Sequence, residues 1–327
     1  MAILAGIDEA GLGPVLGPLV VSGVAFEIPD ELVGQCLWKV LGASCTREVG
    51  KRKRRLVIAD SKKLHKSSAG LAGLERSALV ALAAMGYEAA TGKEDADFAA
   101  LLTAVAPAAR ESFGDYDWYH FEELKLPLCD EVGDVGTQRN AVRRDMSLNG
   151  VQPMAVISEP LPEGHYNRVV EKTRNKAVVL GGQVLKIVDR IVRSAGKHRH
   201  VIIHVDRLGG RRHYREPLSR ALPDFSMHVL TETETYSAYR LMRGGLQVDI
   251  DFGTKGDDRE FVVALASIVS KYIREVSMYA FNRYWCARLE TLKPTAGYYQ
   301  DAQRWLRDAG DTIAAMGVSR DRLIRRR

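Results

Sequence analysis

The chain alternates between short apolar runs and segments with apolar residues at helical spacing. The short runs predict strands at residues 3–7, 19–27, 56–58, 153–158, 200–205, 226–230 and 246–252. The helical periodicities predict helices at residues 30–48, 71–85, 95–109, 173–195, 213–222, 260–283 and 298–317. The glycine- and proline-rich loop between the first two strands predicts that they form an antiparallel pair. Together these elements predict a mixed α/β fold, with a central sheet flanked by helices.

The regular alternation is interrupted between residues 88 and 150, where alanine-rich and polar stretches follow one another. We therefore expect an insertion or cap at 88–150, within a core built from residues 1–87 and 151–285. Residues 286–327 are expected to form a helical C-terminal extension. The aromatic cluster of the insertion could stack on nucleic-acid bases or anchor the cap to its own core, and we expect anchoring. Its members are Tyr116, Trp118, Tyr119, His120 and Phe121.

Composition narrows the class of protein only modestly. The 327 residues are 46% hydrophobic and carry a net charge of +6, which suits a polyanionic partner but does not identify one. The four cysteines are scattered and lack metal-ligand spacing, so we expect reduced thiols. The N-terminal residues do not resemble a secretory signal, and no apolar run has the length of a membrane span. We expect a soluble, cytoplasmic monomer.

Four acidic residues are candidates for chemistry. Asp8 and Asp206 each follow a strongly apolar run, which places them at the carboxyl edge of the sheet, where α/β proteins build sites. Glu9 adjoins Asp8, and Asp257 lies at a predicted helix start. Converging carboxylates repel one another unless cations neutralise them, and oxygen-only ligands suit Mg²⁺ or Mn²⁺. Taken singly, an acid after a buried strand is more often a solvated strand end or a helix N-cap than a metal ligand.

Several motifs occur in an order that resembles the type 2 ribonucleases H, specifically the ribonuclease HII branch. The opening GIDEAGLGPVLGPLVVSGVAF and the later KGDDREFVVALASIVSK are the most specific. ADSKKL at 59–64, HVDR at 204–207 and the Gly297-Tyr298 pair support them. The resemblance covers residues 1–86 and about 150–300. It implies an RNase H-like fold and hydrolysis of the RNA strand of RNA–DNA hybrids by a divalent-metal-dependent endonuclease.

The resemblance also implies residue roles. Asp8, Glu9, Asp206 and Asp257 would be the catalytic metal ligands, with Asp8 bridging two Mg²⁺ or Mn²⁺ ions. Asp258 is an alternative to Asp257, but Asp257 keeps the motif's spacing to Ser267. The residues implied to contact substrate are Gly11, Leu12, Gly13, Ser61, Lys62, Lys271 and Tyr298. For Lys62, Lys271 and Tyr298, an ordinary surface or packing role stays open.

Two positions depart from the family pattern. Leu12 stands where the family has a basic residue, which puts cleavage at a single ribonucleotide embedded in DNA in question. Arg207 follows Asp206 where the family has a small residue. Two alternatives therefore stay open: a nuclease of this fold that acts on another structured nucleic acid, and a non-catalytic nucleic-acid-binding protein with a relict metal site. The basic run at 51–55 could follow a phosphate backbone or be solvated loop charge.

Overall fold

The computed structural model describes residues 1–50, 55–66, 70–91, 96–122 and 124–326, so most of the basic run, residues 51–54, lies outside the described residues. Within the described part of the chain, a seven-stranded sheet has the order β5-β2-β1-β6-β9-β8-β7. Its strands are β1 (Ala2–Ala10), β2 (Leu19–Ile28), β5 (Gln152–Leu161), β6 (His200–Asp206), β7 (Ser226–Glu232), β8 (Tyr236–Arg243) and β9 (Leu246–Gly253). β6 is parallel to both β1 and β9, whereas the other neighbouring strands are antiparallel. The mixed sheet that the sequence predicts is therefore confirmed.

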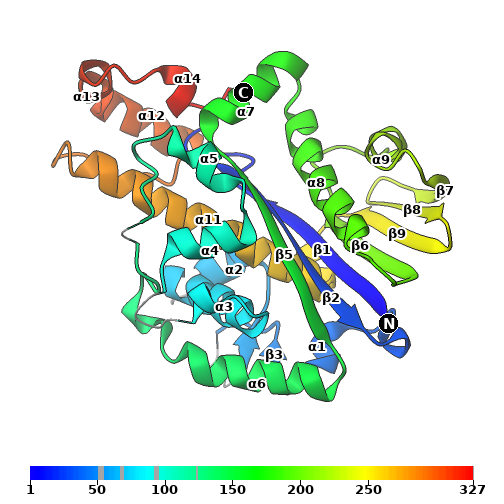
Figure 1. The fold of residues 1–327 in the computed structure, drawn as a ribbon. Helices are drawn as coiled ribbons and strands as arrows, with labels where there is room; N and C mark the ends of the chain where they lie inside the picture. The colour runs from blue at the N-terminus through cyan, green and yellow to red at the C-terminus, as the bar shows by residue number, and fades with distance from the viewer. Residues whose placement is uncertain (51–54, 67–69, 92–95, 123, 327) are drawn as a thin grey trace.

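Helices cover both faces of the sheet (Figure 1). The longer helices are α3 (Gly70–Ala84), α4 (Phe98–Val105), α6 (Val135–Leu148), α7 (Glu163–Thr173), α8 (Lys176–Arg193), α11 (Phe261–Cys286) and α12 (Tyr299–Asp308). The shorter ones are α1 (Leu37–Val40), α2 (Ser61–Lys66), α5 (Ala109–Gly114), α9 (Arg215–Ala221), α10 (Gly256–Arg259), α13 (Gly310–Ala315) and α14 (Arg320–Leu323). The 3-10 turns are η1 (Asp30–Leu32), η2 (Glu88–Ala90) and η3 (Asp130–Val132), and β3 (Cys45–Thr46) pairs with β4 (Leu56–Val57) in a small separate sheet.

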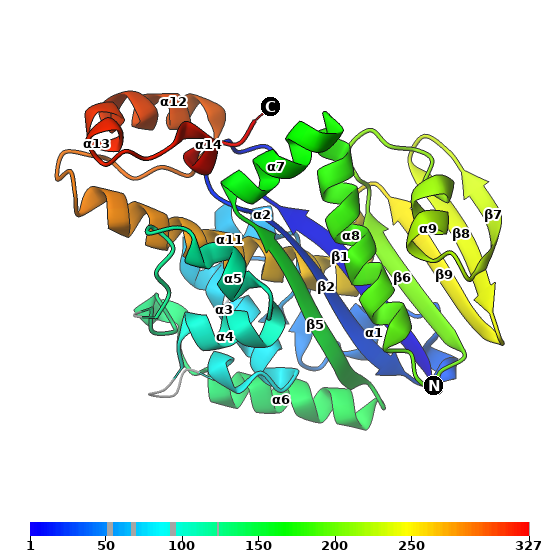
Figure 2. The ribbon, with the colours of Figure 1, turned by 45° about the horizontal axis from the view of Figure 1, so that its top comes forward.

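Each face of β1 contributes to a different hydrophobic core. Ile3, Ala5 and Ile7 pack in the core beneath α8, because alternate residues of a strand point to the same face. The opposite face lies against α11, which crosses the sheet in Figure 2. Gly6 allows this close approach, since a Cβ there would lie 2.3 Å from the backbone carbon of Val262. α11 is consequently held directly against the strand that carries Asp8.

Most predicted elements are present, but several bounds were wrong. The predicted strand 3–7 extends to Ala10, so Asp8 and Glu9 lie on the strand and not in the following loop. The predicted helix 30–48 is instead a 3-10 turn and the four-residue α1, interrupted by Gly34 at φ 78°. The predicted helix 298–317 divides into α12 and α13, and the predicted helix 95–109 is the shorter α4, with α5 beginning only at Ala109. Strand β8 was not predicted.

The aromatic cluster of the 88–150 segment is buried. Trp118 is 1% exposed and lies 5.8 Å, centroid to centroid, from Trp285 of α11. Tyr116, Tyr119 and Phe121 are also buried, whereas His120 is exposed. These rings therefore anchor the segment to the core, as expected, and are not available for stacking on bases. Separately, none of the described helices combines the length and the hydropathy needed to cross a bilayer.

Candidate active site

Two of the four candidate acids lie side by side at one edge of the sheet. β1 and β6 run parallel, with Ile7 opposite Val205, so Asp8 and Asp206 follow at adjacent strand ends. Asp8 is 7% exposed. Burial, followed by repulsion from Glu9 and Asp206, raises the pKa of Asp8 well above its usual value. Asp8 and Asp206 therefore lie next to each other where the pairing of β1 with β6 ends.

Hydroxyl groups from α11 hold the Asp8 position. The Ser270 hydroxyl donates to the Asp8 carbonyl at 3.0 Å, and a hydrogen bond from Ser267 to the Asp8 carboxylate partly offsets the rise in its pKa. Ser61, at the start of α2, is buried and lies 3.0 Å from the Ser267 hydroxyl. Ser61 thus contacts the residue that hydrogen-bonds to Asp8, and the substrate contact that the resemblance implies for Ser61 stays a prediction.

Glu9 and Asp206 form the second part of the acidic edge. Burial, and then repulsion from Asp206, raises the pKa of Glu9 to about 7, while the positive charge of Lys62 opposes the rise. Burial also raises the pKa of Asp206. The Gly256 amide donates to Asp206 Oδ1 at 2.8 Å, which ties the end of β6 to the turn that carries Asp257.

Asp257 is close enough to this edge to interact with it electrostatically. Burial is the largest cause that raises its pKa to about 6, followed by repulsion from Asp60 and Asp206. Asp60 was not among the predicted site residues, although it lies within the quoted motif ADSKKL. Asp258 forms an ion pair with Lys63, whereas Asp257 is repelled by its acidic neighbours, and the choice of Asp257 as the ligand stays a prediction.

The acidic edge offers the oxygen donors that a hard divalent cation requires. All four predicted ligands are carboxylates, and their shared negative charge would be lowered by a bound cation. The side-chain positions, however, do not form a compact cage: no group of three or more His, Cys, Asp or Glu placed to hold a metal occurs among the residues described here. The all-oxygen donor set thus fits Mg²⁺ or Mn²⁺ in its chemistry, although not in its spacing. The positive charge of Lys62 interacts with Glu9, Asp206 and Asp257.

The glycine-containing loop after β1 borders this acidic edge. Gly13 is exposed, whereas Leu12 is half-buried and packs against the core beneath α8. Tyr298 is 51% exposed and lies with its ring 5.8 Å from the guanidinium of Arg274. Its neighbour Gly297 accepts hydrogen bonds from the amides of this loop. Tyr298 is therefore held beside the loop with its ring open to solvent.

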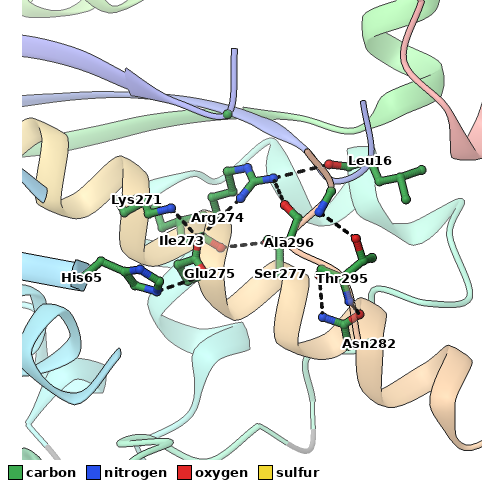
Figure 3. Close-up of polar contacts among 12 residues, drawn as sticks. Leu16, His65, Lys271, Ile273, Arg274, Glu275, Ser277, Asn282, Thr295 and Ala296 are labelled. Carbon is green, nitrogen blue, oxygen red and sulfur yellow. Dashed lines mark hydrogen bonds and ion pairs between the residues drawn. The ribbon is translucent and has the colours of Figure 1, made fainter. Parts of the chain in front are cut away.

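The basic residues that the sequence singled out are in different situations. Lys62 is exposed, whereas Lys271 is 13% exposed and donates to Glu275 at 2.6 Å (Figure 3). Arg207 does not point to the acidic edge, because its guanidinium binds the carbonyls of Gly210, Arg211 and Glu234. Of these three, Lys62 is the one with a charge available to a phosphate.

Comparison with known proteins gives structural likeness without sequence likeness. No family model and no curated protein matches the chain significantly. The fold is that of a mixed α/β protein, and similar solved structures include ribonucleases HII and HIII. The chain aligns with ribonuclease HII of Archaeoglobus fulgidus, solved as a complex of PCNA and RNase HII, at 16% identity and a TM-score of 0.42, covering 99% of this chain and 94% of that one.

Two further structures are similar to the same degree. For ribonuclease H2 of Pyrococcus horikoshii the identity is 12% and the TM-score 0.41, with 98% of this chain and 92% of that chain covered. For Bst-RNase HIII, solved in complex with Mn²⁺, the identity is 14% and the TM-score 0.44, with 99% of this chain and 66% of that chain covered.

Proposed function

We propose that this protein is a divalent-metal-dependent endonuclease that hydrolyses the RNA strand of RNA–DNA hybrids. The observation that carries the proposal is the placement of Asp8 and Asp206 at adjacent parallel strand ends, with Glu9 and Asp257 within electrostatic reach. The order of the sequence motifs around these acids supports the hybrid substrate. The site residues, the metal and the substrate are all parts of this proposal.

In the proposed mechanism Asp8, Glu9, Asp206 and Asp257 would hold Mg²⁺ or Mn²⁺. When bound, the metal supplies charge neutralisation at the phosphate and lowers the pKa of an attacking water. The carboxylates must be ionised to serve as ligands, so binding competes with protons at residues whose pKa values are raised. Hydrolysis breaks the bond between phosphorus and the 3′ oxygen, which leaves 5′-phosphate and 3′-hydroxyl ends.

The remaining residues bind and orient the nucleic acid. Lys62 is exposed next to the acids and contacts a backbone phosphate, which positions the duplex without reading its sequence. Gly11 and Gly13 permit close approach of the loop backbone to the ribose, where the 2′-hydroxyl distinguishes RNA from DNA. Tyr298 packs its exposed ring against the sugar next to the cleaved phosphate.

Leu12 supports a second candidate, a nuclease of the same fold with another preferred substrate. Its side chain packs inward and contributes neither a cation nor a hydrogen-bond donor to the loop. Cleavage rates in Mn²⁺ on a panel of labelled substrates separate the two candidates. The panel contains an RNA–DNA hybrid, duplex DNA, duplex RNA and DNA with one embedded ribonucleotide. The proposed function requires that the hybrid be cut fastest. Faster cutting of a non-hybrid duplex would establish the second candidate instead.

A further inference from the structure

The loop between β1 and β2 is held from beneath by an arginine near the other end of the chain. Arg325 Nη2 donates to the carbonyls of Gly11 and Pro14, and the Arg325 amide donates to the Val15 carbonyl at 2.8 Å. Figures 1 and 2 show the end of the chain reaching this loop beside α7. Residues more than 300 positions apart in the sequence thus meet directly under the loop that follows Glu9.

The guanidinium of Arg325 is committed to this loop. Arg325 is 3% exposed, and Nε and Nη1 are buried without a hydrogen-bond partner in the described part of the chain. The ring centroid of Tyr166 lies 5.0 Å from the guanidinium, and the buried Glu163 is close enough to interact with its charge. Burying a cation is costly unless hydrogen bonds compensate, and the carbonyls of Gly11 and Pro14 are the groups that accept hydrogen bonds from this guanidinium in the described part of the chain.

α7 fixes the segment that carries Arg325, residues 321–326, which we call the tail strap. Asn167 Nδ2 donates to the carbonyls of Asp321 and Ile324 at 2.8 and 2.7 Å. Asn167 Oδ1 accepts the Arg326 amide at 2.7 Å. Three backbone groups of the strap are therefore bound by one buried side chain, which sets the position of Arg325.

A second arginine holds the loop from the side of α11. Arg274 Nη2 donates to the Leu16 carbonyl at 3.4 Å and to the Ala296 carbonyl at 3.0 Å (Figure 3). Gly11, at φ 89°, leaves room for this side chain, because a Cβ would lie 2.6 Å from Arg274 Nε. Gly297 accepts the Val15 amide at 2.8 Å. The loop and Tyr298 are therefore parts of one hydrogen-bonded unit.

We propose that the tail strap positions the loop of Gly11, Leu12 and Gly13 for substrate, with Arg325 as the positioning residue. The part of this inference that concerns substrate rests on the proposed function, whereas the part that concerns the loop does not. Arg325 touches neither substrate nor metal and acts through the carbonyls of Gly11 and Pro14. In this chain, where position 12 is leucine, a buried cation thus holds the loop from its inner side.

Hydrogen–deuterium exchange and hybrid binding test the strap. In Arg325→Met we expect exchange at the Val15, Leu16 and Gly17 amides to rise about tenfold, because the charged hydrogen bonds under the loop are lost. Exchange in β1 and β6 should stay unchanged. Affinity for a fluorescent hybrid in Ca²⁺ should fall about tenfold, and KM should rise more than kcat falls. Arg325→Lys keeps the charge but not the contact to both carbonyls, so it should restore only part of the loop protection and only part of the hybrid affinity.

The matched control is Arg326→Met, which removes one positive charge from the same strap but no contact to the loop, since Arg326 pairs with Asp321 and Glu171. It should leave loop exchange unchanged. Asn167→Leu, which frees the strap without altering Arg325, should raise loop exchange and keeps the test open if Arg325→Met does not fold. The inference is overturned if loop exchange in folded Arg325 and Asn167 variants equals that of the wild type, or if hybrid affinity does not follow it. If the wild type neither binds nor cuts a hybrid, the proposed function fails, and loop exchange alone decides whether the strap holds the loop.

Discussion

Lys63 of α2 forms an ion pair with Asp258 of α10. The negative charge of Asp258 is thereby paired with a cation, whereas the carboxylate of Asp257 is repelled by Asp60 and Asp206. We predict that Asp257→Asn lowers hybrid cleavage at least about 10- to 100-fold, because it removes a proposed metal ligand. Asp258→Asn, which is identical in chemistry and one residue away, should stay within about threefold of wild type. Initial rates at saturating Mn²⁺ measure both, and equal losses would contradict the assignment.

Lys62 and Lys271 offer a second matched pair. Both were predicted to contact phosphate, but Lys271 is bound to Glu275 in the structure whereas Lys62 is exposed. Each phosphate contact contributes about one to the slope of log affinity against log salt concentration. Lys62→Met should therefore reduce that slope by about one, and Lys271→Met should leave it unchanged. Fluorescence anisotropy over a salt series decides; a reduced slope in the Lys271 variant would show that the ion pair opens to bind substrate.

Glu163 makes stability depend on pH. It is fully buried, its Oε1 accepts the Gly17 amide and the Tyr119 hydroxyl, and burial raises its pKa from 4.5 to about 7. A raised pKa in the folded state means that the protonated form is favoured, so its stabilising effect is complete below pH 4.5 and is lost as the pH rises through about 7. The free energy of unfolding should fall by about 3 kcal/mol at most across this window.

Glu163→Gln keeps the shape and the acceptor oxygen but does not titrate. Denaturant titrations of both proteins across the same pH window should show that the wild type loses unfolding free energy relative to the variant as the pH rises. Other groups titrate in the same range, but they are common to both proteins and cancel in the difference. A difference that does not change with pH would mean that Glu163 keeps its ordinary pKa in the folded protein.

Local sequence patterns predicted most strands of the sheet, but they predicted the turns and short helices between the strands less well. The alternating apolar run of β6 placed Asp206 at a strand end, and its parallel pairing with β1 brings that acid next to Asp8. β8 was not predicted, although the Gly244-Gly245 pair that joins it to β9 is typical of a hairpin turn. The helix expected at 30–48 fails because Gly34 adopts a positive φ, which the apolar spacing does not reveal.

The support of the site was harder to predict than its acids. The Ser61–Ser267 contact joins residues 206 positions apart, and the Arg325–Gly11 contact joins residues 314 apart. No periodicity encodes such pairs, because they depend on how α11 and the tail strap pack on the finished sheet. Asp60 is different: it lay within a recognised motif, and its nearness to Asp257 needed only that α2 begin at the acidic edge.

The central claim is that Asp8 of β1 is a ligand of a metal ion that the protein requires to cleave the RNA strand of a hybrid. The most direct measurement compares wild type with Asp8→Asn on a labelled RNA–DNA hybrid in Mn²⁺, alongside calorimetric titration of Mn²⁺ into both proteins. The account predicts that the wild type binds Mn²⁺ and cuts the RNA strand, leaving 5′-phosphate ends, and that the variant remains folded, binds Mn²⁺ more weakly and loses cleavage. A wild type that cuts nothing, or a variant that cuts equally well, would contradict it.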